Sequence, residues 1–341
     1  LMDLVKSGAV SNRQKATFRG KSVTSYALGT KELARWLDRN PLVEFQAVDK
    51  VFDPHEIGRH KGFMTILPAR RVDLTGRVAL HKGKGNVAAG PGEAIDFFNG
   101  AELSRDGRTV FALPSRNREG KPNVLASLEG VPNQFTFREA VDMVVTEYGV
   151  GMLRGRSVRE RAQALIEVAH PEDRRALVDA AKEQKVLFDD QIFLEDSAHL
   201  YPDEVATKHR FGDLEVRFRA IRPSDEDQMR RLFYRFSDKS VYYRYFSPIK
   251  TMPHSKMQEY VNVDYRQVMS IVGLIGPVGQ GQIIAEARFV RHRGRPDADI
   301  AFVVDEEQQG HGIATHMYAM LVRLARERGI HGFTADVLAS N

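Results

Sequence analysis

Cysteine is absent from the 341 residues of the chain. Its absence excludes disulfide bridges, thiolate metal sites and a cysteine nucleophile together. Catalysis must therefore rest on other groups, and we expect no bound metal. A chain without disulfides also fits a reducing compartment, so we expect a cytoplasmic protein.

Long apolar runs are also missing. None approaches the roughly 18 uninterrupted apolar residues that a membrane-spanning helix needs, and the N-terminus lacks the charged-then-apolar pattern of a secretory signal. The sequence therefore predicts no membrane contact. It opens on Leu1 and stops at Asn341, just after the apolar run 333–338, so we expect a fragment cut at both ends.

A strong charge of one sign is lacking as well, because 50 Lys and Arg residues face 45 Asp and Glu residues, for a net charge of +5. A nucleic-acid-binding surface would need clustered basic residues with interleaved exposed aromatic residues. No such stripe is present, so we expect no nucleic-acid partner. A local excess of arginine at 217–244 suits either a phosphate-bearing ligand or a solvated face.

The patterns that are present predict an α/β fold. Up to about Glu147, short β-rich runs alternate with turn clusters and helical patterns. Thr30 is the expected N-cap of one helix, and Ser157 with Glu160 forms a capping box at the start of another. A further helix is expected after His170-Pro171. The expected strands of this part are 22–28, 42–48, 63–67, 109–113 and 142–146.

The stretch 188–212 loses periodicity and contains Pro202 and Gly212, so we interpret it as a connector on the surface. The expected domains are residues 1–187 and 213–341. In the second domain the α/β pattern restarts, with expected strands at 216–221, 268–274, 283–290, 300–304 and 333–338.

The sharpest local signal in the second domain is a strand, then Gln309-Gly310-His311-Gly312-Ile313-Ala314, then a long helix. Glycines at such a junction let the backbone turn tightly and present several N–H groups, and the helix N-terminus adds a positive partial charge. This combination binds a pyrophosphate. The loop is neither a Walker loop nor a G-x-G-x-x-G fingerprint.

The loop matches Q/R-x-x-G-x-G/A, with Gln309, Gly312 and Ala314 at the defining positions, and this part of the chain resembles the GNAT family of N-acetyltransferases. The runs 216–227 and 299–304 resemble the family's opening strand and helix and its fourth strand, in the expected order. The resemblance implies that the loop, Gly310 included, binds the pyrophosphate of acetyl-CoA. It also implies that backbone N–H groups near Val303 polarise the thioester carbonyl.

In many members of this family a Glu near the start of the fourth strand deprotonates the amine, and the matching position here is Asp299. Aspartate reaches one methylene less far, so an exposed strand end is an equally good interpretation. Glu286, on the preceding strand, is the second candidate. His311 and His316 lack the i, i+4 spacing of a zinc pair, and we interpret them as surface residues.

The family continues beyond its fifth strand with elements that bring an acid to the leaving thiol, and these have no counterpart before Asn341. The resemblance therefore leaves open whether this part alone has acetyltransferase activity.

Several runs of the first 187 residues together resemble the C-terminal domain of the acetyl-CoA hydrolase and CoA-transferase family, which includes 4-hydroxybutyrate and succinate:acetate CoA-transferases. The runs follow one another in the family's order. They are 28–30, 40–45, 72–77, 95–97, 111–115, 145–150, 153–155 and 159–171.

The resemblance implies covalent catalysis by a glutamate that attacks the thioester and forms a glutamyl-CoA intermediate. In the family this residue lies shortly before the segment that corresponds to Leu1. Glu147 could substitute for it, but we favour a structural, hydrogen-bonded role. The glycine loop 83–92, with Gly90 and Gly92, is expected either to bring N–H groups to a thioester or phosphate of CoA, or to be a flexible surface turn.

The sequence thus predicts an enzyme whose two parts both use acyl-CoA. The first would transfer CoA between small carboxylic acids or hydrolyse acetyl-CoA, and the second would acetylate an amine, with a protein lysine as a plausible substrate. We also expect a homo-oligomer. In the alternative hypothesis, the second part is a non-catalytic acyl-CoA sensor that regulates the first.

Overall fold

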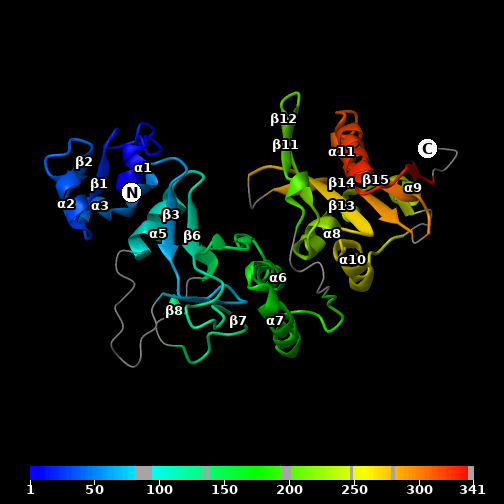
Figure 1. Ribbon diagram of the computed structural model, residues 1–341, viewed down its shortest axis with the longest axis horizontal. Helices are drawn as coiled ribbons and strands as arrows, with labels where there is room; N and C mark the ends of the chain where they lie inside the picture. Colours follow the sequence, from blue (N-terminus) through cyan, green and yellow to red (C-terminus); the bar gives the residue numbers. More distant parts are fainter. Residues whose placement is uncertain are drawn as a thin grey trace. The chain divides into compact units, whose positions relative to one another are not determined.

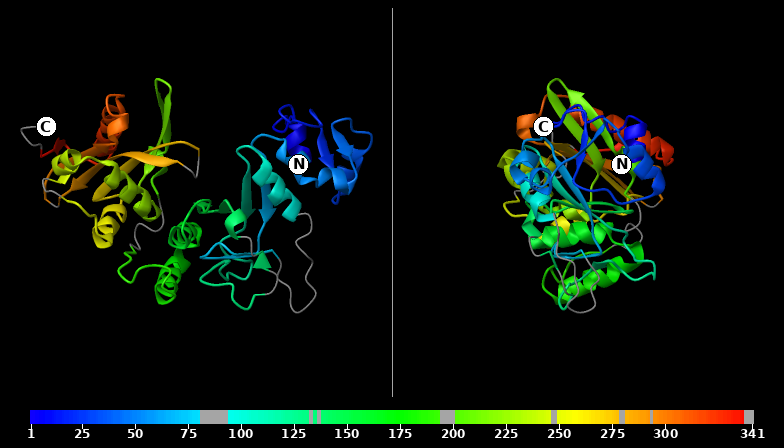
Figure 2. Two further views of the ribbon diagram at one scale, coloured as in Figure 1. Left: turned by 180° about the vertical axis from the view of Figure 1, so that it is seen from behind. Right: turned by 90° about the vertical axis from the view of Figure 1, so that its left-hand side faces the viewer.

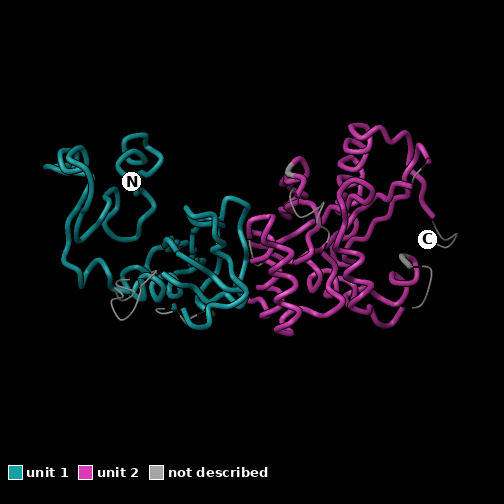
Figure 3. The backbone as a smooth tube through the Cα atoms, turned by 60° about the horizontal axis from the view of Figure 1, so that its bottom comes forward, with its two compact units in different colours: residues 1–154 teal, residues 155–341 magenta. Residues whose placement is uncertain are grey.

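The computed structural model describes residues 1–80, 94–131, 134–135, 138–193, 201–245, 249–277, 281–292 and 294–336. The chain divides into two compact units, Leu1–Arg154 and Gly155–Asn341 (Figure 3). Helices and sheets occur in both units, which confirms the α/β class (Figure 1). Within the described residues, none of the helices combines the length and the apolar character needed to cross a bilayer.

The first unit contains three small sheets. Strands β3, β6 and β9 run parallel, and β10 returns antiparallel to β9. A two-stranded parallel sheet joins β1 to β2, and a third sheet has the order β7-β4-β5-β8. The strands are β1 (Ser22–Thr24), β2 (Val43–Phe45), β3 (Met64–Pro68), β4 (Arg71–Asp73), β5 (Val78–Ala79), β6 (Arg108–Ala112), β7 (Val124–Leu125), β8 (Gln134–Phe135), β9 (Met143–Thr146) and β10 (Gly149–Met152).

Five helices are described in this unit: α1 (Met2–Lys6), α2 (Lys31–Leu37), α3 (Val48–Val51), α4 (Pro54–Gly58) and α5 (Ala94–Leu103). Thr30 caps α2 as expected, because its hydroxyl accepts a hydrogen bond from Leu33 N–H. The expected strands 22–28 and 42–48 are too long, since each forms only three residues of strand and Val48 already begins α3.

The second unit is built on a six-stranded sheet of order β11-β12-β13-β14-β15-β16. Neighbouring strands are antiparallel except for the last pair, β15 and β16, which is parallel. The strands are β11 (Thr207–Phe211), β12 (Leu214–Ala220), β13 (Val268–Ile275), β14 (Gln282–Arg291), β15 (Asp297–Val304) and β16 (Gly332–Thr334).

Helices cover both faces of this sheet. Phe302 contacts Tyr318 on one face, whereas Glu286 contacts Tyr260 on the other. Figure 1 accordingly shows α11 above the sheet and α8 and α10 below it. The described α-helices of the second unit as a whole are α6 (Val158–Val168), α7 (Pro171–Glu183), α8 (Glu226–Arg235), α9 (Asp238–Tyr245), α10 (His254–Val261) and α11 (Ile313–Glu327).

The expected connector at 188–212 is wrong in part. Its last residues form β11, which pairs with β12 in a hairpin that Figure 2 shows from behind. Gln191 and Val205 are buried, so the segment also contributes to the interior. The sequence of β11 lacks the alternation of apolar and polar residues that marks a strand, because Lys208, His209 and Arg210 are all exposed on this edge strand.

Helices α6 and α7 belong to the second compact unit, although the sequence assigned them to the first domain. The expected limits 1–187 and 213–341 remain a prediction about evolutionary domains, which need not coincide with compact units. The capping box of α6 is present, with Ser157 and Glu160 bonding each other's backbone N–H groups.

Candidate functional site

A groove opens where β15 and β16 separate. Among the described residues, the two strands pair only from Asp297 to Asp299, opposite residues 332–334, while β15 continues to Val304. The groove has a volume of about 470 Å³ and is lined by residues 299–304 of β15, by Gln309 and by residues 334–336. Phe236, Ser240 and Tyr243, from the end of α8 and from α9, close its remaining side.

The strand register decides which backbone amides face the groove. Asp305 N–H donates to Ile284 O at 2.7 Å, and Val303 lies opposite Glu286 in the same antiparallel ladder. Because hydrogen-bonded pairs alternate along such a ladder, the amide of Val303 points toward β14. The amides of Phe302 and Val304 point toward the open edge instead. Val303 lines the groove, but the available N–H groups belong to its two neighbours.

The glycine loop follows directly after β15. Gly310 has φ of +77° and Gly312 has φ of +84°, and no heavy atom lies within 4 Å of a Cβ placed on either residue. Backbone conformation, not lack of space, therefore requires glycine at both positions. Gln309 Nε2 donates to Val304 O at 3.1 Å, which ties the loop to the end of the strand.

Helix α11 begins one residue after this turn. Its N-cap is Gly312, which offers no side chain to the first N–H groups, and its first turn, which includes Ala314, carries no acidic residue. The N-terminus of this 15-residue helix thus keeps its donors and its positive partial charge for an anion. The loop and the helix suit a pyrophosphate.

Carboxylates before the loop are anchored by Arg235 of α8 and by Ser237, which lies between α8 and α9. Arg235 Nε donates to Asp305 Oδ2 at 2.7 Å, and Ser237 donates to Glu306 Oε1 from both N–H and hydroxyl. Hydrogen bonds from Ser240 and Ser237 lower the pKa of Glu306. The position of the loop is therefore coupled to the helices that line the groove.

Several of the described arginines at 217–244 form contacts inside the unit. Arg219 forms two hydrogen bonds of 2.6 and 2.7 Å to the buried carboxylate of Asp225. Arg230 pairs with Glu226, and Arg217 donates to the carbonyl of Gly276. The side chains of Arg217, Arg219 and Arg230 therefore brace the fold.

Asp299 lies at the end of the groove where β15 and β16 still pair. Its Oδ2 is 2.8 Å from His292 Nε2, and Thr334 Oγ1 donates to its Oδ1. These hydrogen bonds, the one from Thr334 first, lower the pKa of Asp299. The side chain is 49% exposed, so a substrate from solvent can approach it.

Glu286 has a different environment. It is fully buried and accepts hydrogen bonds from Tyr260 Oη at 2.8 Å, from Ser270 Oγ at 2.6 Å and from Arg288 Nε at 2.6 Å. The guanidinium of Arg288 also stacks on the ring of Tyr260. A carboxylate held in this way braces the sheet against α10, and it is not among the residues that line the groove.

The remaining sequence candidates lie elsewhere. Gly90 and Gly92 fall outside the described residues. Glu147 accepts hydrogen bonds from Ser115 N–H at 2.9 Å and from Ser115 Oγ at 2.6 Å, which fits the structural role that we favoured. His316 stacks on His209 at 4.3 Å, and burial lowers the pKa of His316.

Sequence reasoning missed the contribution of α9 to the groove. Ser240 and Tyr243 reach β15 only through the packing of the unit, and no local pattern marks them. Thr334 was likewise missed, because only the β15–β16 register brings it beside Asp299.

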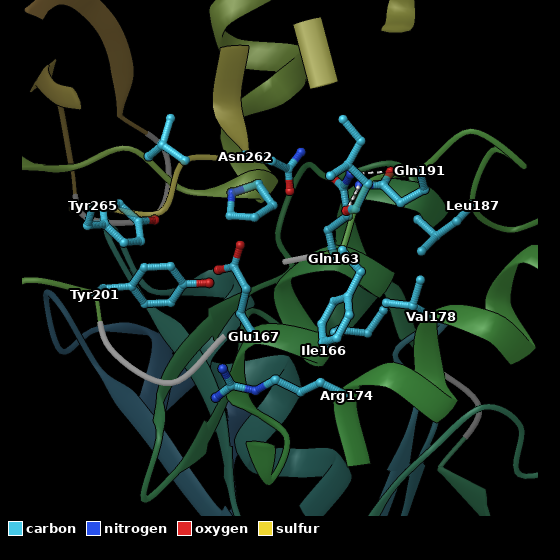
Figure 4. A pocket seen from close by; sticks show the side chains of 14 residues that line it. Gln163, Ile166, Glu167, Arg174, Val178, Leu187, Gln191, Tyr201, Asn262 and Tyr265 are labelled. Atoms are coloured by element: carbon cyan, nitrogen blue, oxygen red, sulfur yellow. Dashed lines mark hydrogen bonds between the residues drawn. The ribbon is translucent and has the colours of Figure 1, made fainter. Parts of the chain in front are cut away.

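A second, smaller cavity of about 50 Å³ lies in the same unit, next to α6 (Figure 4). Glu167 points into it, opposite Tyr201 and Tyr265, and accepts a hydrogen bond from Ser224 N–H at 3.0 Å. Burial raises the pKa of Glu167. Gln163 and Gln191 bond each other on another wall of the cavity.

Two family models match the chain. Residues 29–181 match the acetyl-CoA hydrolase/transferase C-terminal domain, and residues 234–341 match the acetyltransferase (GNAT) family. The first part of the chain is therefore similar to the acetyl-CoA hydrolase/transferase C-terminal domain and the second part to the GNAT family, as the sequence motifs predicted.

Individual relatives agree with this division. The 4-hydroxybutyrate coenzyme A transferase of Clostridium kluyveri is 37% identical over 54% of this chain and 43% of its own length. The acetyltransferase Pat of Mycolicibacterium smegmatis is 34% identical over 36% of each chain. The crystal structure of RipA from Yersinia pestis superimposes with a TM-score of 0.51 at 34% identity, over 55% of this chain and 42% of that one. The chain thus spans less than half the length of these relatives.

Proposed function

We propose that the groove beside β15 binds an acyl-CoA and that the second unit transfers its acetyl group to an amine, with a protein lysine as the acceptor. The observation that carries this proposal is the open edge of β15, which ends at a positive-φ glycine turn and an uncapped helix N-terminus. The GNAT match of residues 234–341 supports it.

The groove offers donors for each part of the ligand. The turn at Gly310 and Gly312 and the first N–H groups of α11 suit the pyrophosphate, which carries the negative charge. The edge amides of Phe302 and Val304 suit the carbonyl groups of the pantetheine arm and of the thioester. An N–H bonded to the thioester oxygen stabilises the oxyanion that forms when an amine attacks the carbonyl carbon.

For the CoA-transferase-type segment we propose transfer of CoA between small carboxylic acids, or hydrolysis of acetyl-CoA, through a glutamyl-CoA thioester. The match of residues 29–181 and the relatives named CoA transferases support this part. Both activities then use the same thioester. We further propose that the protein acts as a homo-oligomer in the cytoplasm.

The test of the proposal compares two glycines that flank α11. Gly312→Ala and Gly329→Ala both place a side chain at positive φ, at the two ends of this helix, with free space around each Cβ. Both should cost about 1 kcal/mol of stability. Only Gly312→Ala should weaken acetyl-CoA binding, by roughly tenfold, because only this residue lies in the loop at the groove.

Acetyl transfer is measured on a lysine-containing peptide by mass spectrometry, and acetyl-CoA binding by calorimetry, on the same preparations. Equal effects of the two glycine substitutions on binding would contradict the site. Saturable binding without acetylation of any peptide would contradict the activity and favour an acyl-CoA sensor.

A further inference from the structure

The hairpin between β14 and β15 brings a histidine beside Asp299, which lines one end of the groove. His292 directly follows β14, and its Nε2 is 2.8 Å from Asp299 Oδ2. Thr334 Oγ1 donates to the other carboxylate oxygen of Asp299. Asp299 is thus held between β16 and the hairpin, with a hydrogen bond on each oxygen.

This arrangement fixes the proton on the imidazole. An ionised carboxylate can only accept hydrogen bonds, so Nε2 must be the protonated nitrogen and Nδ1 carries the lone pair. The side chain of His292 is 45% exposed, and no hydrogen bond to its Nδ1 is found among the described residues. Nδ1 is therefore available to a group that enters from solvent.

The same contacts make Asp299 a poor base on its own. Its pKa lies below the ordinary value, first because of the hydrogen bond from Thr334 and then because of that from His292. Proton transfer is most effective when the base titrates near the working pH, and an imidazole is the side-chain group with this property. Among the described residues, Arg295 and Asp297 are also charged groups at this corner; they pair with each other at 2.8 Å, and Arg295 lies 4.0 Å from Asp299 Oδ1.

The spacing along β15 places Asp299, and with it the imidazole that it bonds, near a thioester carbonyl held at Phe302. Asp299 precedes Phe302 by three residues, which is about 10 Å in an extended strand. A hydrogen bond from the Phe302 amide to a thioester oxygen, the attacking nitrogen and a hydrogen bond from that nitrogen to a base together span about this length.

Building on the acetyl transfer proposed above, we propose that His292 is the general base for the amine and that Asp299 is the residue that positions it. Nδ1 takes a proton from the substrate ammonium group, and the neutral amine then attacks the thioester carbon. The new C–N bond forms, the C–S bond breaks, and CoA leaves as the thiolate, which takes up the proton that the attacking nitrogen loses as the amide forms. Asp299 stabilises the imidazolium form of His292, which exists from the time Nδ1 takes the proton until the proton is released.

The proposal is tested with His292→Asn, Asp299→Asn and a control, His331→Asn, in the intact chain. His331 is also exposed and lies next to the same hairpin, where its N–H bonds Pro296 O, but its side chain has no part in the mechanism. Steady-state acetylation of a lysine peptide is measured from pH 6 to about pH 10, together with acetyl-CoA binding by calorimetry.

We expect His292→Asn to lower kcat by roughly 100- to 10,000-fold near neutral pH while acetyl-CoA binding changes less than about twofold. The loss should shrink toward pH 10, because more of the lysine is then already deprotonated. Asp299→Asn should lower kcat less, by about 10- to 100-fold, since the imidazole remains. His331→Asn should behave as the unmodified protein.

Two results would overturn the proposal: unchanged kcat in His292→Asn, or a larger loss in Asp299→Asn than in His292→Asn, which would make Asp299 the base. Failure of the proposed function gives a different result, because the unmodified protein would then acetylate no peptide although it binds acetyl-CoA. Retained binding in His292→Asn excludes misfolding as the cause of its loss.

Discussion

At the scale of single residues, buried charge in the second unit is the most informative feature. Asp225 is 2% exposed, and although burial alone would raise its pKa, the charge and the hydrogen bonds of Arg219 lower it. Glu167 is also buried, and burial raises its pKa although the charge of Arg222 and the hydrogen bonds from Ser224 oppose this rise. The contribution of Asp225 to the free energy of unfolding therefore rises with pH, whereas the contribution of Glu167 falls.

Replacing Glu167 by Gln should stabilise the protein more at neutral pH than in acid. A raised pKa means that the folded state binds the proton more tightly than the unfolded state, so the free energy of unfolding falls as pH rises above the ordinary value of 4.5. Gln carries no charge and can still accept from Ser224 N–H. The difference between variant and unmodified protein, measured by urea denaturation, should grow from pH 4 to pH 7.

Glu183→Gln is the control for this experiment, because Glu183 is an exposed residue at the end of α7. Its stability difference should not vary with pH. A difference for Glu167→Gln that is constant or shrinks toward neutral pH would contradict the burial argument.

At the scale of elements, α6 shows what sequence patterns can and cannot give. The capping box and the apolar stripe of Ala162, Leu165, Ile166 and Ala169 were predicted, and all four residues are buried. The opposite face was not predicted to be buried, because Arg159, Gln163 and Glu167 are polar residues at helical spacing. In the structure Arg159 stacks on Phe188, Gln163 bonds Gln191, and Glu167 bonds Ser224.

Ser157→Ala should lower the free energy of unfolding by about 1 kcal/mol, because α6 loses its N-cap while nearly all its residues are buried. Thr30→Ala removes a similar cap from α2, which has no buried residue, and should cost less than about 0.5 kcal/mol. Circular dichroism during urea denaturation compares the two. Equal costs would show that burial of the helix does not control the effect of its cap.

The groove, like α6, could be predicted only in part, because local patterns mark some of its residues whereas contacts between distant segments bring in the others. The loop Gln309–Ala314 is a local pattern with a local cause, since its glycines adopt positive φ at the start of α11. The separation of β15 from β16 and the approach of Ser240 and Tyr243 depend on contacts between distant segments. The contact of His292 with Asp299 was hidden as well, because only the hairpin register brings the two residues together.

At the scale of the whole molecule, the chain combines two segments whose relatives use the same coenzyme. The α/β class and the order of the two segments followed from the sequence, because each carries several motifs in its family's order. The interpretation of 188–212 as a surface connector did not hold in full, since β11 and the buried Gln191 make this stretch part of the second unit. A polar edge strand has no periodicity that marks it.

The central claim is that main-chain amides at the open edge of β15 and in the glycine turn bind an acyl-CoA. Amide hydrogen exchange of the intact chain, with and without saturating acetyl-CoA, measures these groups directly. The claim predicts slower exchange at Phe302, Val304 and residues 310–315, with little change at Val303, whose amide already faces β14. Unchanged exchange at Phe302 and Val304 in the presence of bound acetyl-CoA would contradict it.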